Sequence, residues 1–194
     1  MFKIGIIAYS SKILSYYGTA TALSVARRSL AAASVGDYAL FGGGYADVVS
    51  AVVDAYDTSL VRTTPTALSV ARYYLAAASV GNYALFSGGY ASAADATVDA
   101  YDTSLVRTTP TALSVARYYL AAASVGNYAL FGGGYASAVS ATVDAYDTSL
   151  VRTAPTALSA ARYDLAAASV GDYVLFGGGY ASAVSATVDV YQYN

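Results

Sequence analysis

The chain has 194 residues, 57% of them hydrophobic, and a formal net charge of −2 from ten basic residues and twelve acids, all of them Asp. This length can bury a core as one domain, and the weak negative charge gives no sign of the basic surface typical of nucleic-acid binding, so we expect no nucleic-acid partner. Without Cys, the chain has no disulfides or thiolate chemistry, although its compartment stays open. Without His, it lacks the commonest metal ligand and general base. No apolar run is long enough for a membrane-spanning helix, so we expect no membrane partner.

The first 22 residues have some features of a signal peptide. A lysine lies near the start, an apolar GIIAY follows, and small residues occur at Ala20–Ala22. Ser10, Ser11 and Lys12 interrupt the apolar segment, which such a peptide would keep continuous. We therefore interpret residues 1–20 as a strand segment that closes the array described next.

From residue 21 onward the sequence repeats every 45 residues. Each repeat begins with TALS, and the second and third repeats differ at only four positions. The four repeats span 21–65, 66–110, 111–155 and 156–194, the last being shorter. One structural unit is therefore used four times.

Each repeat contains four predicted strands. In the third repeat they are Leu120–Val125, Tyr128–Phe131, Ala141–Tyr146 and Leu150–Thr153. The first two flank a Gly-Asn turn and predict a β-hairpin, and glycines close the second strand. The alanines of the first strand also favour helix, but a glycine follows too soon for one. Four strands in tandem units predict an all-β array of small radial sheets, a β-propeller with four four-stranded blades per chain.

Several residues of each repeat resemble the kelch repeat. They are Arg117 before the first strand, the doublet Gly133–Gly134 after the second, and VDAYD at Val143–Asp147 in the third. The resemblance covers residues 21–194 and implies a kelch-like β-propeller. Kelch units usually carry a Trp after the third strand; this chain has none, and Leu150 and Val151 occupy that place. The near-identical repeats also resemble kelch-like proteins of Gram-positive bacteria and their phages.

We expect a single domain over residues 1–194 that closes through its ends. Ile13–Tyr17 precedes TALS as Leu60–Thr63 precedes Thr66, so it is predicted to pair with the third strand of the fourth repeat. Closure would remove an open sheet edge and give a four-bladed ring. The alternative is a homodimer in which two chains form one eight-bladed ring, because kelch rings usually have more than four blades.

The predicted site consists of repeated arginines and tyrosines. By resemblance to kelch domains that bind acidic peptides, the arginines would face the axis and bind an acidic group, with the tyrosines as an aromatic rim. The alternative is that each arginine pairs with an Asp of its own or the next repeat. The predicted ligand-binding residues are Arg27, Arg72, Arg117, Arg162, Tyr73, Tyr118 and Tyr163. The loops at Tyr45, Tyr90, Tyr135 and Tyr180 are the second candidate.

No metal site, cofactor or catalytic residue is predicted. The Asp residues around each strand tyrosine could offer oxygens to calcium, but alternation along a strand separates them. Turn capping, or pairing with Arg62, Arg107 and Arg152, fits them better. The triple glycines lack the lysine and helix of a phosphate loop.

The expected function is a non-catalytic recognition module for a protein or glycan that binds at the propeller axis. The alternative is a structural or self-assembling component of a phage particle or cell surface. An enzyme is not expected, because kelch-type copper oxidases need His and a sialidase-like site needs a Glu to activate its tyrosine.

Overall fold

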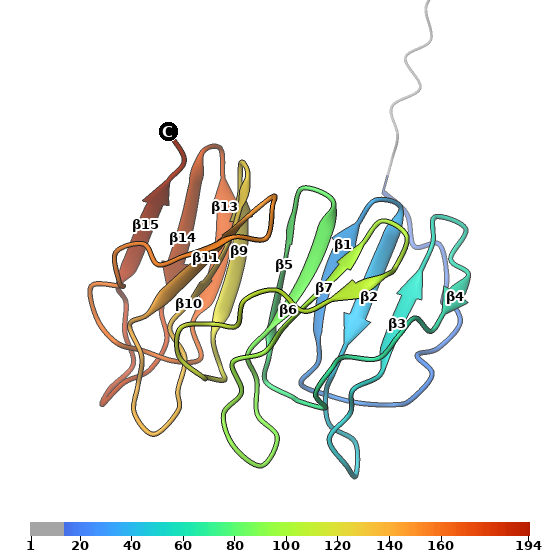
Figure 1. The fold of residues 1–194 in the computed structure, drawn as a ribbon, viewed down its shortest axis with the longest axis horizontal. Coiled ribbons are helices and arrows are strands. Elements are labelled where there is room, and N and C mark those ends of the chain that lie inside the picture. The colour runs from blue at the N-terminus through green and yellow to red at the C-terminus, as the bar shows by residue number, and fades with distance from the viewer. Residues whose placement is uncertain (1–13) are drawn as a thin grey trace, which may run out of the picture.

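The computed structural model describes residues 14–194, which form fifteen β-strands and no helix. Among these residues there is consequently no helix that could cross a bilayer. The strands form four antiparallel sheets, one per repeat, in sequence order within each sheet (Figure 1).

The first sheet holds β1 (Ala31–Val35), β2 (Tyr38–Gly42), β3 (Val53–Tyr56) and β4 (Arg62–Thr63). The second holds β5 (Ala76–Val80), β6 (Tyr83–Ser87), β7 (Val98–Asp102) and β8 (Arg107–Thr108). The third holds β9 (Ala121–Val125), β10 (Tyr128–Gly132), β11 (Val143–Asp147) and β12 (Arg152–Thr153). The fourth holds β13 (Ala166–Val170), β14 (Tyr173–Gly177) and β15 (Val188–Gln192).

The predicted hairpins are confirmed. Val35 pairs with Tyr38 across a two-residue turn, and Gly36 in that turn has a φ of 51°. Glycine adopts this left-handed conformation without steric cost, which is why the Gly-Asp and Gly-Asn sequences select the turn. The helical alternative for the alanine-rich segments does not occur in residues 14–194.

The fourth strand is shorter than predicted in the first three sheets and is absent from the fourth sheet, which has three strands. In the third repeat it begins at Arg152 rather than Leu150. Leu150 has a φ of 62° and its N–H donates to the carbonyl of Asp147, so the chain is still turning there. The Asp147 carboxylate accepts N–H bonds from Ser149 and Val151, 2.8 and 2.9 Å long, and fixes this turn. Turn capping by this Asp is therefore confirmed.

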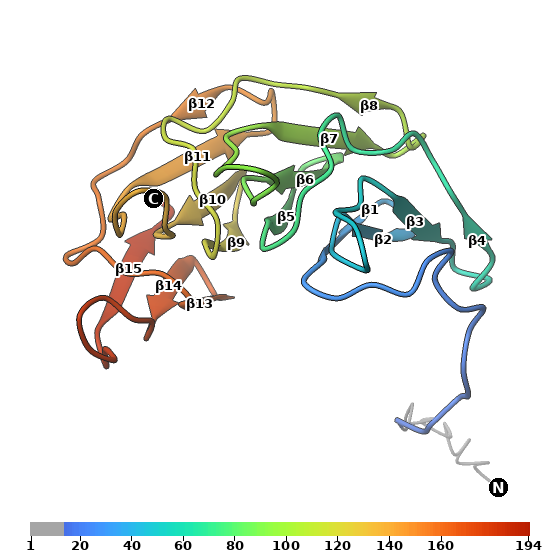
Figure 2. The same ribbon diagram turned by 90° about the horizontal axis from the view of Figure 1, so that it is seen from below.

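The sheets stand side by side in an open arc, with their first strands on its inner side (Figure 2). β1 lies beside β5, β5 beside β9 and β9 beside β13. The small alanine side chains allow this close approach, as expected for strands near an axis. Sheets one and four lie at opposite ends of the arc, so the predicted four-bladed ring is not closed in this single chain.

The predicted closing strand is also not formed in this chain. Leu14–Tyr17 belongs to no strand, and Leu14, Tyr16 and Tyr17 are exposed. Ile13, like the start of the region with signal-peptide features, lies outside the described residues. β15 is paired only with β14.

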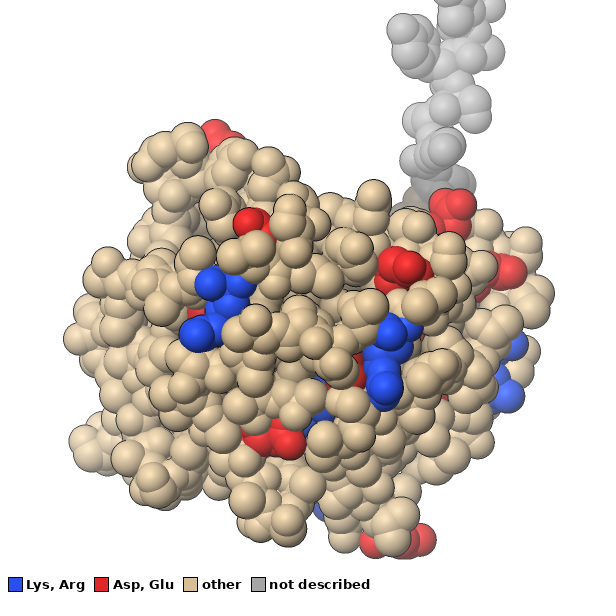
Figure 3. Space-filling view, viewed as in Figure 1, with Lys and Arg blue, Asp and Glu red and all other residues tan. Residues whose placement is uncertain are grey.

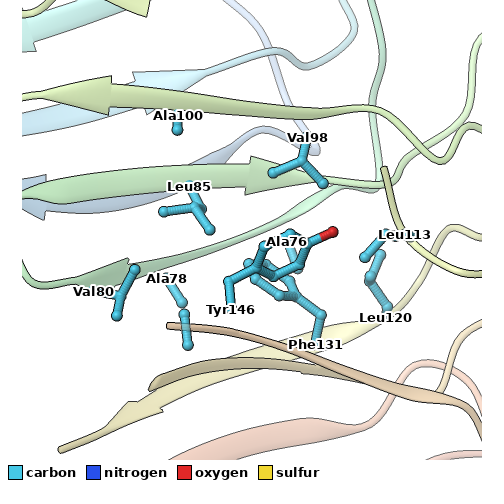
Figure 4. Packing of buried hydrophobic residues seen from close by; sticks show 11 residues of the cluster. Ala76, Ala78, Val80, Leu85, Val98, Ala100, Leu113, Leu120, Phe131 and Tyr146 are labelled. Carbon is cyan, nitrogen blue, oxygen red and sulfur yellow. The ribbon is translucent and has the colours of Figure 1, made fainter. Parts of the chain in front are cut away.

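The core is divided into three similar clusters, one between each pair of adjacent sheets. Between the second and third sheets, Leu85 and Val98 pack against Phe131 and Tyr146 (Figure 4). All four side chains are 0% exposed. We call the side of a sheet that carries Val98 its valine face, and the side that carries Phe131 its aromatic face. The valine face of each sheet packs on the aromatic face of the next.

Candidate functional site

Each of the four repeated arginines forms an ion pair with an aspartate of its own sheet. Arg72 Nη2 lies 2.7 Å from Asp99 Oδ2, and both side chains are 0% exposed. Arg117 is equally buried, 2.8 Å from Asp144. The other two pairs are Arg27–Asp54 at 2.8 Å and Arg162–Asp189 at 2.6 Å. The structure therefore corresponds to the second interpretation, an Asp pair within the same repeat, and does not bring the four guanidiniums together at the axis.

Further bonds show what these arginines hold in place. Arg72 Nη2 donates to the carbonyl oxygen of Phe86 at 3.0 Å, so it connects the segment before β5 to β6 and β7. The same carboxylate, Asp99, accepts the N–H of Ser69 from the TALS segment at 3.1 Å. The Tyr101 hydroxyl donates to the carbonyl of Thr66, also in TALS, at 2.7 Å. These contacts recur in every repeat and give the arginine, TALS and the VDAY sequence a structural role.

The charge of the arginines is balanced by these contacts. Burial alone would raise the pKa of Asp144, but the hydrogen bond from Arg152 and the charge of Arg117 hold it below its ordinary value. Arg152 Nη1 lies 2.7 Å from Asp144 Oδ1, which confirms the predicted pairing with this arginine. The pKa values of Asp54 and Asp189 are also lowered, there by the hydrogen bonds from Ser24 and Ser159 first and by Arg27 and Arg162 next. Each of the four repeated arginines thus has a carboxylate partner within its own repeat.

The repeated tyrosines lie together at one end of the sheets. Tyr73 and Tyr90 extend the second sheet by an antiparallel bridge, with N–H to carbonyl distances of 3.0 and 2.8 Å in the two directions. The glycine doublet makes this possible, because Gly88 and Gly89 have φ values of 66° and 114°, and a Cβ on Gly89 would lie 3.0 Å from the Tyr73 carbonyl oxygen that accepts one of these bonds. The bridge places the two predicted tyrosine sets next to each other.

Seven tyrosine rings form one continuous row across all four sheets. Neighbouring ring centroids are 5.0 to 5.8 Å apart, within the range of favourable aromatic pairs. In order along the arc they are Tyr45, Tyr73, Tyr90, Tyr118, Tyr135, Tyr163 and Tyr180. We call this set the tyrosine row. It lies at the end of the sheets where the long β2–β3, β6–β7 and β10–β11 loops project, drawn at the bottom of Figure 1.

The row combines partial exposure with mutual contact. Six of its rings are half-buried and Tyr180 is exposed. Burial, followed by the neighbouring Tyr135 and Tyr90, raises the pKa of Tyr118. At the start of the row the Arg28 guanidinium lies 5.4 Å from the ring centroid of Tyr45, which is a cation–π contact. The tyrosine row thus leaves aromatic rings partly accessible to solvent along one surface.

A hollow of about 190 Å³ lies beside the row, on the inner side of the arc. Tyr74 and Tyr119 stack across it with ring centroids 4.0 Å apart. Its lining comes from the same two positions in all four repeats: Ser29, Leu30, Tyr74, Leu75, Tyr119, Leu120, Asp164 and Leu165. Backbone hydrogen bonds link these positions from sheet to sheet, from Tyr74 N–H to Ser29, from Tyr119 to Tyr74 and from Asp164 to Tyr119.

Charged groups contribute little to the outer surface. The face in Figure 3 shows only a few separate blue or red side chains on a largely uncharged surface. Within residues 14–194 no group of three or more carboxylate, imidazole or thiolate side chains could hold a metal ion. Uncharged side chains therefore make up most of this face.

The sequence did not indicate that the two tyrosine sets join. Tyr73 and Tyr90 are separated by a complete hairpin, and each bridge depends on the left-handed glycines between them. A usable signal was present: both positions recur with the 45-residue period and flank the same hairpin.

No protein-family model matches the chain, and no curated protein matches it either.

Proposed function

We propose that this chain is a non-catalytic recognition module that binds a protein or glycan along the tyrosine row. The observation that carries the proposal is the continuity of the row, in which seven rings from four repeats lie 5.0 to 5.8 Å from their neighbours. Tyrosine offers a large rigid contact area together with a hydroxyl group, at low conformational-entropy cost. An array of such rings suits an extended ligand better than a small molecule.

Within this proposal the ligand is held by tyrosines rather than by the repeated arginines. Tyr73, Tyr118 and Tyr163 keep the ligand-binding role expected for them, and the loop tyrosines join them. The arginines hold the backbone beside this surface in place, because Arg72 and Arg117 lie one residue before row members and are fully buried. An acidic group on the ligand is therefore not required.

We further propose that the four sheets are consecutive blades of a kelch-type β-propeller. The support is the order of strands within each sheet, the adjacent first strands and the arc that they follow. Electron microscopy of the purified protein should show sheets arranged around a central axis. Sheets stacked in a straight row would contradict the propeller.

A glycan and peptide array, followed by titration of any hit, tests the binding role. Tyr118→Ala should weaken binding at least about tenfold, equivalent to 1.4 kcal/mol, whereas Tyr118→Phe keeps the ring and should lose less. Val106→Ala is the control, since Val106 is 56% exposed in the β7–β8 turn, at the end of the second sheet opposite Tyr73 and Tyr90. If Tyr118→Ala binds like the unaltered protein, or if Val106→Ala weakens binding as much, the row is not the binding surface.

A further inference from the structure

The two ends of the arc leave complementary faces uncovered. Val80, Val98 and Ala100 of the second sheet's valine face are 3%, 0% and 0% exposed. Their counterparts in the fourth sheet, Val170, Val188 and Val190, are 65%, 52% and 56% exposed. The difference arises because the first three valine faces are each covered by the next sheet.

The first sheet leaves the opposite face uncovered. Phe86 and Tyr101 on the second sheet's aromatic face are 0% exposed, while Phe41 and Tyr56 at the same positions are half-buried. A hollow of about 410 Å³ opens over them. Its lining is apolar but for one threonine and one tyrosine hydroxyl: Ala20, Thr21, Leu23, Ala39, Phe41, Tyr56 and Leu60.

We propose that a second copy of this chain docks head to tail on the first, with the aromatic face of its first sheet on the valine face of the fourth sheet. The argument is continuity with the three interfaces inside the chain, which already join the same two kinds of face. The proposal does not depend on ligand binding by the tyrosine row. Such a heterologous contact closes into a ring or continues as a filament.

A glycine in the fourth sheet leaves space for the aromatic ring of a docked sheet. A Cβ on Gly132 would lie 2.7 Å from the Phe176 ring, so that glycine admits the aromatic ring of the next sheet. The equivalent Gly177 has only Val188 of its own sheet nearby, at 3.6 Å. Phe41 of the second copy takes the place over Gly177 that Phe176 takes over Gly132.

Backbone groups at the two ends also match. Gly134 N–H donates to the carbonyl of Arg162 in the next sheet, and Leu158 N–H donates to that of Ala141 in the previous one. In the docked pair Gly179 N–H donates to Arg27 of the second copy, and Leu23 N–H of that copy donates to Ala186. The contact therefore has a defined register in addition to apolar area.

In the docked pair, residues before TALS in the second copy also supply the fourth strand that the fourth sheet lacks. In the first sheet β4 pairs Arg62 with Tyr56 and Thr63 with Ala55. Tyr17 and Gly18 lie 45 residues before Arg62 and Thr63, and they belong to no strand here. In the docked pair Tyr17 and Gly18 of the second copy lie beside Tyr191 and Val190, so the predicted closing pair forms between copies.

Sedimentation velocity on the full chain and on two variants tests the docking. The unaltered 19.8 kDa chain should assemble to twice that mass or a higher multiple as concentration rises. Phe41→Asp and Val188→Asp each place a charge in one face and should each leave a monomer. A chain that stays monomeric at every concentration overturns the proposal.

Mixing the two variants distinguishes head-to-tail docking from other association. Phe41→Asp retains an intact valine face and Val188→Asp an intact aromatic face, so the mixture should form a one-to-one complex through a single interface. This outcome also shows that both variants are folded. Two monomers in the mixture, or variants that still assemble alone, overturn the proposal.

A control and a cross-link complete the test. Val48→Asp changes a valine that is 72% exposed in the β2–β3 loop, away from both faces, and should assemble like the unaltered chain. Ser79 Oγ donates to the carbonyl of Ser34 across an internal interface at 2.6 Å. Ser34→Cys and Ser169→Cys on separate copies should therefore form a disulfide, as should Ser34→Cys with Ser79→Cys in one chain. An assembled sample in which only the latter pair links overturns the register.

Discussion

The second and fourth sheets begin with the same five residues, AAASV, but these residues have different environments. In the second sheet Ala76 and Val80 are 7% and 3% exposed, whereas Val170 in the fourth is 65% exposed. The residues that bury a valine face come from the following repeat, so burial here is a property of neighbouring pairs of sheets. Stability in such an array is close to a sum of unit and nearest-neighbour terms.

Breaking a buried ion pair should give the largest difference between these two sheets. Asp99→Ala leaves Arg72 buried without its carboxylate, which should cost about 3–5 kcal/mol of unfolding free energy. Asp189→Ala should cost less, because the Asp189 side chain is 15% exposed and water can replace it. Urea titrations measure both, with Asp47→Ala on the exposed surface as the control. Equal losses from the two substitutions would contradict a neighbour-dependent stability.

A core leucine should show the same asymmetry at a smaller size. Leu85→Ala removes a side chain that is 0% exposed and should cost about 2–5 kcal/mol through lost burial and the resulting cavity. Leu175 takes the same place in the fourth sheet but is only half-buried, so Leu175→Ala should cost less. Melting curves of dilute protein, in which no second copy covers Leu175, provide the measurement. The idea fails if Leu175→Ala is the more damaging change.

Two glycines separate the cost of backbone strain from that of contact with the next sheet. Gly178 has a φ of 71° and only a carbonyl oxygen 3.9 Å from an added Cβ, so Gly178→Ala should cost about 1–2 kcal/mol from its left-handed backbone alone. Gly88 has a φ of 66°, but its Cβ would lie 2.6 Å from the Arg117 carbonyl oxygen, so Gly88→Ala should cost more. Equilibrium unfolding of both variants tests this order, and indistinguishable stabilities would mean that the sheets can shift apart without cost.

Alkaline pH should reveal a weaker contrast between the fourth sheet and its neighbours. Burial, followed by the charge of Asp189, raises the pKa of Tyr191 to about 12 from an ordinary value of 10.0. Burial and the charge of Asp144 raise the pKa of Tyr146 further. A raised pKa contributes stability that is complete below pH 10 and is lost as the pH rises through the folded value.

The Tyr191 contribution should therefore disappear between pH 10 and about 12. Stability measured against pH should be flatter over this window in Tyr191→Phe, and phenolate absorbance should show Tyr191 titrating before Tyr146. A Tyr191→Phe variant with the slope of the unaltered chain would contradict this assignment.

Local features of the repeat were predictable because they are encoded within a few residues. The Gly-Asp and Gly-Asn hairpins and the capped turn at Asp147 follow from short-range backbone chemistry. The start of the fourth strand was misplaced because Leu150 adopts a positive φ, which its residue type does not indicate.

Features that depend on contacts between distant residues were harder to predict from the sequence. Whether Arg72 points to the axis or to Asp99 depends on how the TALS segment packs, and the sequence left both interpretations open. Openness of the array was also missed, since complementary ends alone do not say whether they meet within one chain or between two.

The 45-residue period has a genetic consequence. Each interface joins the same two kinds of face, so an in-frame gain or loss of one repeat inside the array would add or remove a whole sheet without interrupting any hairpin. The adjoining sheets would meet through contacts already present elsewhere in the chain. Each such event would lengthen or shorten the aromatic surface by two rings, so recombination between near-identical coding units would change the reach of the surface in fixed increments.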